Sequence, residues 1–166
     1  HRILPWREDP TGYKVWISEI MLQQTRVEAV KPYFQRFIEE LPDIESLANA
    51  KEEQLLKLWE GLGYYNRVRN LQKAAKQILE SYEGKMPETA EELKNLTGIG
   101  SYTAGAISSI AFGKKAPAVD GNVLRILSRV ALDEDDVLKE STKKRIEQQI
   151  MDVIPAERPG DFNQAL

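Results

Sequence analysis

The spacing of apolar residues constrains the fold most, because apolar positions recur every three to four residues along nearly the whole chain. Two-residue alternation, the pattern of half-buried strands, is almost absent. Residues 13–29 are apolar on most sides and predict a buried helix, and further helices are expected over 65–82 and 101–112. Hydrophobic residues make up 42% of the 166 residues, which is enough for a packed core. The sequence therefore predicts an all-α fold of about ten short helices.

Local signals predict several helix starts. Pro32 is expected in the first turn of a helix, where its missing N–H does no harm. Asp43 is a candidate N-cap, as are Ser141 or Thr142 for a later helix. A last helix is expected to begin at Asp161.

The composition excludes several kinds of chemistry. The chain has no Cys, and its one His is His1, so disulfides, thiolate nucleophiles, cysteine-bound metals and histidine-dependent triads are ruled out. Catalysis must rest on carboxylates, Tyr, Lys, Arg or backbone groups. No apolar run approaches the roughly 18 to 20 residues of a membrane span, and no signal peptide is visible. We therefore expect a cytoplasmic protein, processed or truncated because it begins with His rather than Met.

The net charge of −3 argues mildly against nucleic-acid binding, since binding proteins usually carry a basic patch. The charges are unevenly distributed, however. The stretch "GYYNRVRNLQKAAK" is basic and aromatic, and acidic segments lie on either side of it. One basic face with acidic flanks is the expected arrangement.

A glycine turn in "NLTGIGSYTAGAI" joins two expected helices. Gly98 and Gly100 allow positive φ angles and close backbone approach. The turn is short and lacks the Lys of a nucleotide phosphate loop. Free N–H groups at the start of the second helix could bind a phosphodiester without basic side chains. A plain connection between helices, with Ile99 as an apolar plug, explains the same residues.

Two carboxylates occupy unusual places. Glu19 lies among apolar neighbours in "VWISEIMLQQT", where desolvation would raise its pKa and prepare a general acid. The alternatives are an exposed Glu on one polar stripe with Ser18, or an internal hydrogen-bond partner. Asp120 in "PAVDGNV" is an ordinary N-cap candidate, and the same helix start would keep it ionised. One neutral and one charged carboxyl group suit glycosidic cleavage. From the residue types alone, both interpretations remain open.

Several stretches, "LPWR", "SEIMLQQTRV", "WEGLGYYNRVRNL" and "LTGIGSYTAGAISSIAFGKKAPAVDGNVLRILSR", together resemble the adenine DNA glycosylase (MutY) family of the helix-hairpin-helix superfamily. The resemblance implies a six-helix barrel with the hairpin over 6–132, and an incomplete second helical subdomain over 133–166 with 1–5. The family continues past "FNQAL" into a four-cysteine loop and a domain that recognises 8-oxoguanine. The chain is thus expected to be a catalytic-domain fragment without a metal site, with a 4Fe–4S cluster on cysteines beyond residue 166.

The resemblance also assigns catalytic roles. Glu19 would protonate the departing adenine, and Asp120 would stabilise the cationic sugar. Tyr102 would lie beside the reacting nucleotide, and Asn122 would orient Glu19 or the water. The residues expected to form the pocket for the extruded adenine are Trp6, Arg7, Leu22 and Gln164.

The DNA contacts implied by the resemblance come from two segments. Gln24 would wedge into the duplex, and backbone groups of the hairpin would hold a phosphate. The full set of expected DNA-binding residues is Gln23, Gln24, Thr25, Gly98, Ile99, Gly100 and Ser101.

The implied function is removal of adenine mispaired with 8-oxoguanine or guanine in double-stranded DNA, by a monomer associated with the nucleoid. Related lyases carry a Lys at the position of Tyr102, so a monofunctional hydrolase of N-glycosyl bonds is expected, with weak or no activity in the fragment. The alternatives are a pyrimidine-damage glycosylase and AP lyase of the same fold, a non-catalytic hairpin module that binds DNA, and a helical protein-interaction domain.

Overall fold

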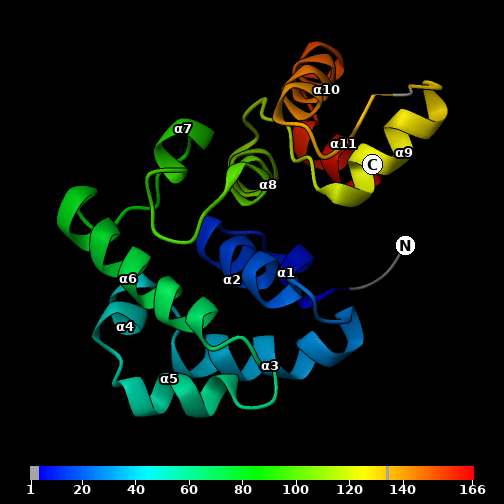
Figure 1. Ribbon diagram of the computed structural model, residues 1–166. Helices are drawn as coiled ribbons and strands as arrows, with labels where there is room; N and C mark the ends of the chain where they lie inside the picture. The colour runs from blue at the N-terminus through cyan, green and yellow to red at the C-terminus, as the bar shows by residue number, and fades with distance from the viewer. Residues whose placement is uncertain (1–3, 134) are drawn as a thin grey trace.

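A computed structural model describes residues 4–133 and 135–166. Within these stretches all regular structure is helical (Figure 1), which confirms the all-α prediction. The helices are α1 Pro5–Glu8, α2 Gly12–Leu22, α3 Val27–Glu40, α4 Ile44–Asn49, α5 Glu52–Trp59, α6 Asn66–Ser81, α7 Ala90–Leu93, α8 Ser101–Phe112, α9 Gly121–Val130, α10 Glu140–Val153 and α11 Pro159–Ala165. None of the described helices is long and apolar enough to cross a membrane.

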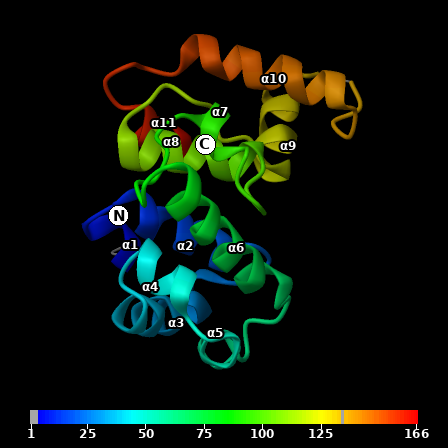
Figure 2. The same cartoon turned by 90° about the vertical axis from the view of Figure 1, so that its left-hand side faces the viewer.

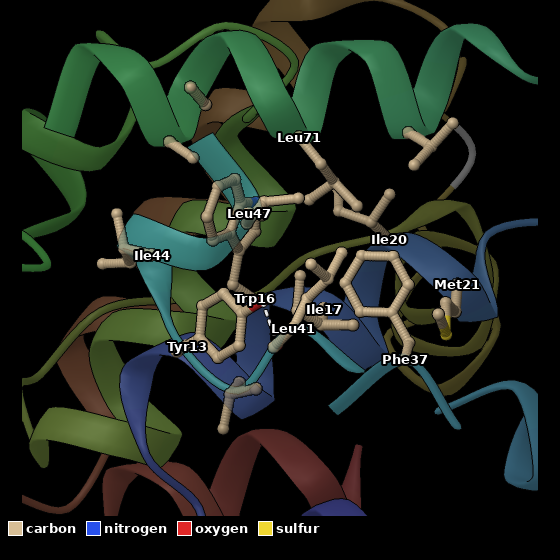
Figure 3. Close-up of a cluster of buried hydrophobic side chains, with 14 of the residues drawn as sticks. Tyr13, Trp16, Ile17, Ile20, Met21, Phe37, Leu41, Ile44, Leu47 and Leu71 are labelled. Atoms are coloured by element: carbon tan, nitrogen blue, oxygen red, sulfur yellow. Dashed lines mark hydrogen bonds between the residues drawn. The ribbon is translucent and has the colours of Figure 1, made fainter. Parts of the chain in front are cut away.

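Helix α2 lies at the centre of the larger apolar cluster, with side chains of α3, α4 and α6 around it (Figure 3). Trp16, Ile17 and Met21 of α2 are almost completely buried. The Tyr13 hydroxyl donates a hydrogen bond to the Leu41 carbonyl oxygen at 2.8 Å, so its polar end is satisfied. Burying one large apolar side chain stabilises a fold by about 1.5–3 kcal/mol, and this dense packing fixes α2 firmly.

A smaller apolar cluster joins α9, α10 and α11, which lie together at one end of the molecule (Figure 2). Its buried members are Val119, Val123, Leu124, Ile146, Ile150 and Ile154. The two clusters divide between α8 and α9, and Leu4 belongs to the larger one. The expected domain boundary at residue 132 stays a prediction.

Helix α8 links the two clusters through backbone contacts at glycines. A Cβ atom added at Gly105 would collide with the backbone carbonyl oxygen of Pro117. One added at Gly160 would lie 2.8 Å from the Ser109 carbonyl oxygen. The segment before α9 and the start of α11 can therefore lie directly against α8.

In the first half of the chain, two expected features are wrong and one is confirmed. The prediction of a single helix over 13–29 is wrong, because α2 ends at Leu22. The next residues form a loop in which Gln24 has a φ of 59°. Pro32 lies inside α3 rather than in its first turn. Asp43 is confirmed as an N-cap, since its side chain accepts a hydrogen bond from a backbone N–H at 2.8 Å.

Two expected helix starts in the C-terminal part are wrong. Helix α10 begins at Glu140, so Ser141 and Thr142 lie within it and Lys139 is its N-cap. Helix α11 begins with a proline, two residues before Asp161. Proline suits the first turn because no helical hydrogen bond is lost there.

Candidate active site

A cavity of about 310 Å³ lies where α1, α2, α8, α9 and α11 meet, and is called the inner cavity below. Glu19 reaches it from α2, Tyr102 from the first turn of α8, and Asp120 and Asn122 from the start of α9. The fold thus brings together all four residues predicted to be catalytic.

The residues predicted to hold the extruded base line the same inner cavity. Trp6 and Leu22 provide apolar surface, and Arg7 and Gln164 provide polar groups. Trp6 is buried and packs edge to face on Phe34, with ring centroids 5.4 Å apart. An apolar cavity with a few polar groups is typical of small-molecule and nucleobase sites.

Glu19 is partly exposed on the cavity wall. Burial raises the pKa of Glu19 above its usual range, and the negative charge of Asp120 acts in the same direction. The Tyr102 hydroxyl and the positive charge of Arg7 oppose this shift without cancelling it. A carboxyl group that retains its proton closer to neutral pH can serve as a general acid.

Tyr102 stays a neutral phenol. Burial raises its pKa, and so do the neighbouring charges of Glu19 and Asp120. A phenol in this state keeps the hydrogen that it can donate toward a carboxylate. Tyr102 therefore stabilises the ionised form of Glu19, which is the form left after a proton has been transferred.

Asp120 is the N-cap of α9. Its Oδ1 accepts hydrogen bonds from the backbone N–H groups of Asn122 and Val123, both at 2.8 Å. Its Oδ2 accepts one from Asn122 Nδ2 at 3.2 Å, and Arg125 donates to Asn122 Oδ1. These donors orient the Asp120 carboxyl group, and the helix N-terminus places partial positive charge beside it. The N-cap prediction is confirmed, and the expected role of Asn122 toward Glu19 or water stays a prediction.

A wider and more open groove adjoins the inner cavity and is called the outer groove below. It shares Glu19, Leu22, Tyr102, Asp120 and Asn122 with the inner cavity. Its outer walls are Gln23 and Gln24 on one side and Tyr64 and Arg67 on the other. The inner cavity therefore opens to the surface between two loops. Thr25 lies on the first loop, where its hydroxyl donates to the Gln23 carbonyl oxygen at 3.4 Å.

The glycine hairpin lies between α7 and α8. Gly98 has a φ of 80°, Ile99 is buried in the larger cluster, and Gly100 is the N-cap of α8. Ser101 is the first residue of α8 and Tyr102 the second. The hairpin thus fixes Tyr102 at the cavity, with Ile99 as its apolar plug. Its contact with a DNA phosphate stays a prediction.

Asn163 is a site residue that the sequence did not reveal. Its Oδ1 accepts a hydrogen bond from the Ala118 N–H at 3.2 Å, and its Nδ2 donates to Ser109 Oγ and the Ala116 carbonyl oxygen, both at 2.8 Å. These bonds fasten α11 to the segment that leads into Asp120. The partners are 45 to 54 positions away, so no local pattern signals the role.

The sequence profile of the HhH-GPD superfamily base excision DNA repair proteins matches residues 17–156. The chain belongs to this superfamily. The assignment agrees with the motifs around Glu19, the glycine hairpin and Asp120, and it confirms the family resemblance predicted from sequence.

Curated relatives are named adenine DNA glycosylase. The chain is 47% identical to the Mus musculus protein over 176 residues, covering 99% of this chain and 34% of that one. The Homo sapiens protein is also 47% identical, with 99% and 32% covered. The Buchnera aphidicola protein (from Schizaphis graminum) is 45% identical, with 98% and 47% covered. The chain thus spans about a third to a half of these relatives' length.

Solved structures of other glycosylases are similar in fold. A thermostable thymine-DNA glycosylase superimposes with a TM-score of 0.86 at 26% identity, covering 98% of this chain and 75% of that one. A non-covalent endonuclease III–DNA complex gives 0.78 at 28% identity, covering 92% and 70%. These similarities confirm the helix-hairpin-helix glycosylase fold.

Proposed function

We propose that this chain is the catalytic region of an adenine DNA glycosylase, which hydrolyses the N-glycosidic bond of adenine mispaired with 8-oxoguanine or guanine. The observation that carries the proposal is the pair of carboxyl groups on one cavity. Burial raises the pKa of Glu19, whereas three N–H donors surround Asp120. The name shared by relatives up to 47% identical supports adenine as the base.

Extrusion of the nucleotide is the first step, because the glycosidic bond is shielded inside a stacked duplex. The outer groove accepts the DNA, and the base enters the inner cavity. Trp6 and Leu22 provide the apolar surface for the base, and Arg7 and Gln164 provide hydrogen-bonding groups for its edges. Apolar surface alone would not distinguish one purine from another, so we assign base selection to the polar groups.

Bond cleavage follows from the two carboxyl groups. Protonated Glu19 transfers its proton to N7 of adenine, and the C1′–N9 bond breaks with its electron pair moving to the base. The positive charge that develops on the sugar is stabilised by the Asp120 carboxylate. Water then adds to C1′ and loses a proton to a carboxylate, which leaves an abasic site. The Tyr102 hydroxyl stabilises Glu19 after its proton has gone.

The same site disfavours a lyase. Formation of a Schiff base requires an amine near C1′, and no lysine lines the inner cavity or the outer groove among the described residues. Tyr102 lines both spaces beside the carboxyl pair and has no amine. The reaction therefore stops at the abasic site.

The likeness to a thymine-DNA glycosylase and to endonuclease III makes a glycosylase of another base the second candidate. Those chains are 26–28% identical to this one, compared with 43–47% for the mammalian relatives named adenine DNA glycosylase. A DNA-binding module without catalysis would not require Glu19 and Asp120 to line the same cavity.

The proposed partner is double-stranded DNA, bound by a monomer, and its location would be the cytoplasmic nucleoid where that DNA lies. A 4Fe–4S cluster, if the whole protein has one, would be bound by cysteines outside these residues. The chain itself has no Cys, so its own side chains do not fit such a cluster, and no step above uses one.

The test is single-turnover excision from matched duplexes that carry adenine opposite 8-oxoguanine, adenine opposite guanine, or thymine opposite guanine, with alkali to reveal abasic sites. We expect release from the two adenine duplexes only, at a low rate when this region acts alone. Glu19→Gln should slow release by ~10²- to 10⁴-fold without weakening duplex binding. Glu28→Gln on the exposed part of α3 is the matched control, since Glu28 is exposed and pairs with Lys31 rather than with a residue of the site. Thymine release, or a Glu19→Gln rate within a few-fold of the parent, would contradict the proposal.

A further inference from the structure

The Arg67 guanidinium lies between the two loops that wall the outer groove. Its NH1 donates to the carbonyl oxygens of Ile20 at 2.9 Å and Gln23 at 2.6 Å. Its NH2 donates to those of Leu62 at 3.0 Å and Gly63 at 3.2 Å. One side chain therefore joins the end of α2 to the turn before α6.

The environment of Arg67 is specific to a planar guanidinium. The group lies 5.4 Å from the Trp59 ring centroid and 5.6 Å from that of Tyr64. The last carbonyl groups of a helix have no partner within the helix and attract cations, and Arg67 supplies donors to those of α2. A lysine ammonium cannot point its hydrogens in two opposite directions within one plane while contacting two rings.

Each loop presents an exposed residue with a left-handed backbone. Gln24 has a φ of 59° and Tyr64 a φ of 48°, and both side chains line the outer groove. Tyr64 is 67% exposed although it is large and aromatic. Such conformations are unfavourable for residues other than glycine and persist where the surroundings hold them. The Arg67 side chain donates hydrogen bonds to the backbone of both loops.

We propose that Arg67 is a positioning residue that holds the two walls of the outer groove as one unit, so that Gln24 and Tyr64 meet the duplex at a fixed separation. The inference rests on the proposed function, because it assigns Arg67 to extrusion of the base. Arg67 does not line the inner cavity, so breakage of the bond is left to Glu19 and Asp120.

The test compares Arg67→Lys with Arg69→Lys. Arg69 lies on the same helix, and its side chain pairs with the exposed Glu52 at 2.9 Å rather than with the backbone of either loop among the described residues. Backbone amide exchange is measured over 20–26 and 61–65, with α3 as internal reference. Extrusion is followed by the fluorescence of 2-aminopurine, an adenine analogue, placed in the duplex opposite guanine at saturating protein.

We expect Arg67→Lys to speed exchange in both loops but not in α3, and to slow extrusion about tenfold or more, since a misplacement of about 1 Å can lower rates as strongly as 10²-fold. The pH dependence of bond cleavage should stay that of the parent, because Glu19 keeps its surroundings. Arg69→Lys should match the parent in every measurement.

Two results would overturn the inference. Unchanged exchange in either loop would show that Arg67 does not join them. Faster exchange in both loops with parental extrusion would show that their separation does not matter. If the parent protein extrudes 2-aminopurine but releases no adenine, the proposed function fails while the positioning role is still decided by these measurements.

Discussion

The two carboxyl groups of the site depend on different parts of the molecule. Glu19 lies on α2, which is surrounded by the larger cluster, whereas Asp120 precedes α9, whose apolar face packs in the smaller one. The larger cluster holds its helices by extensive apolar burial. The smaller one adds polar links such as those of Asn163. Stability differs from region to region within a fold. The separation between Glu19 and Asp120 is therefore only as well defined as the position of Asp120, which depends on the smaller cluster.

The largest effect is expected from the larger cluster. Phe37 is fully buried and packs edge to face on Trp59, with centroids 6.0 Å apart. Phe37→Ala should lower the free energy of unfolding by about 3–5 kcal/mol, as measured by urea denaturation. The exposed Val130→Ala is the control and should stay within about 0.5 kcal/mol of the parent. A loss below about 1 kcal/mol at Phe37 would mean that this cluster is not the main source of stability.

A truncation in the smaller cluster should act locally. Ile150 is buried in that cluster, and Ile150→Ala should cost about 2 kcal/mol or more. Amide exchange should become faster in α9, α10 and α11, while α2 keeps its protection. Equal loss of protection in α2 would show that the two clusters unfold as one unit. Their local stabilities would then not differ.

Asn163 tests the polar link between the halves. Asn163→Asp keeps an acceptor for the Ala118 N–H but loses the amide hydrogens given to Ser109 and Ala116. An unsatisfied buried acceptor costs about 1–3 kcal/mol, so thermal denaturation should show a loss of this size. Adenine release should slow while the pH dependence set by Glu19 is retained. Asn49→Ala, at an exposed helix end, is the control. A parental release rate would show that this link does not position Asp120.

The smallest effect on stability is expected from the ionisation of Glu19. Because the pKa of Glu19 is raised in the folded state, the ionised group disfavours the fold, and its contribution to stability is lost as pH rises through the folded pKa. Glu19→Gln should therefore melt at a higher temperature than the parent near pH 8. The difference should vanish below about pH 4, where Glu is protonated in both states. A lower melting temperature at pH 8 would contradict the direction of the shift.

Sequence patterns predicted the features that depend on neighbouring residues. The helix over 101–112 and the N-caps Asp43 and Asp120 follow from local periodicity and capping. The sequence predicted a desolvated Glu19 from its apolar neighbours, and in the structure burial raises the pKa of Glu19. The family resemblance then brought the residues of the inner cavity together, which periodicity alone could not do.

The features that the sequence did not predict depend on distant contacts. The helix expected over 13–29 stops at Leu22, where Arg67, more than forty positions away, donates to the carbonyl oxygens of Ile20 and Gln23. The polar residues 23–26 interrupt the apolar pattern at the break, but a short polar run alone does not show that a helix ends. Asn163 was not predicted because its hydrogen-bond partners are 45 to 54 positions away in the sequence. Thr142 suited a cap by residue type, but it is buried inside α10.

The contact between Gly105 and Pro117 has a consequence for how much sequence change the site tolerates. A single methyl group at position 105 would push aside the backbone that carries Asp120, although Gly105 touches neither carboxyl group. The reaction therefore requires glycine at position 105 as strictly as it requires Glu19. In a library that varies every residue and selects for repair, glycine should be the only amino acid to survive there, a restriction set by steric volume rather than by chemistry.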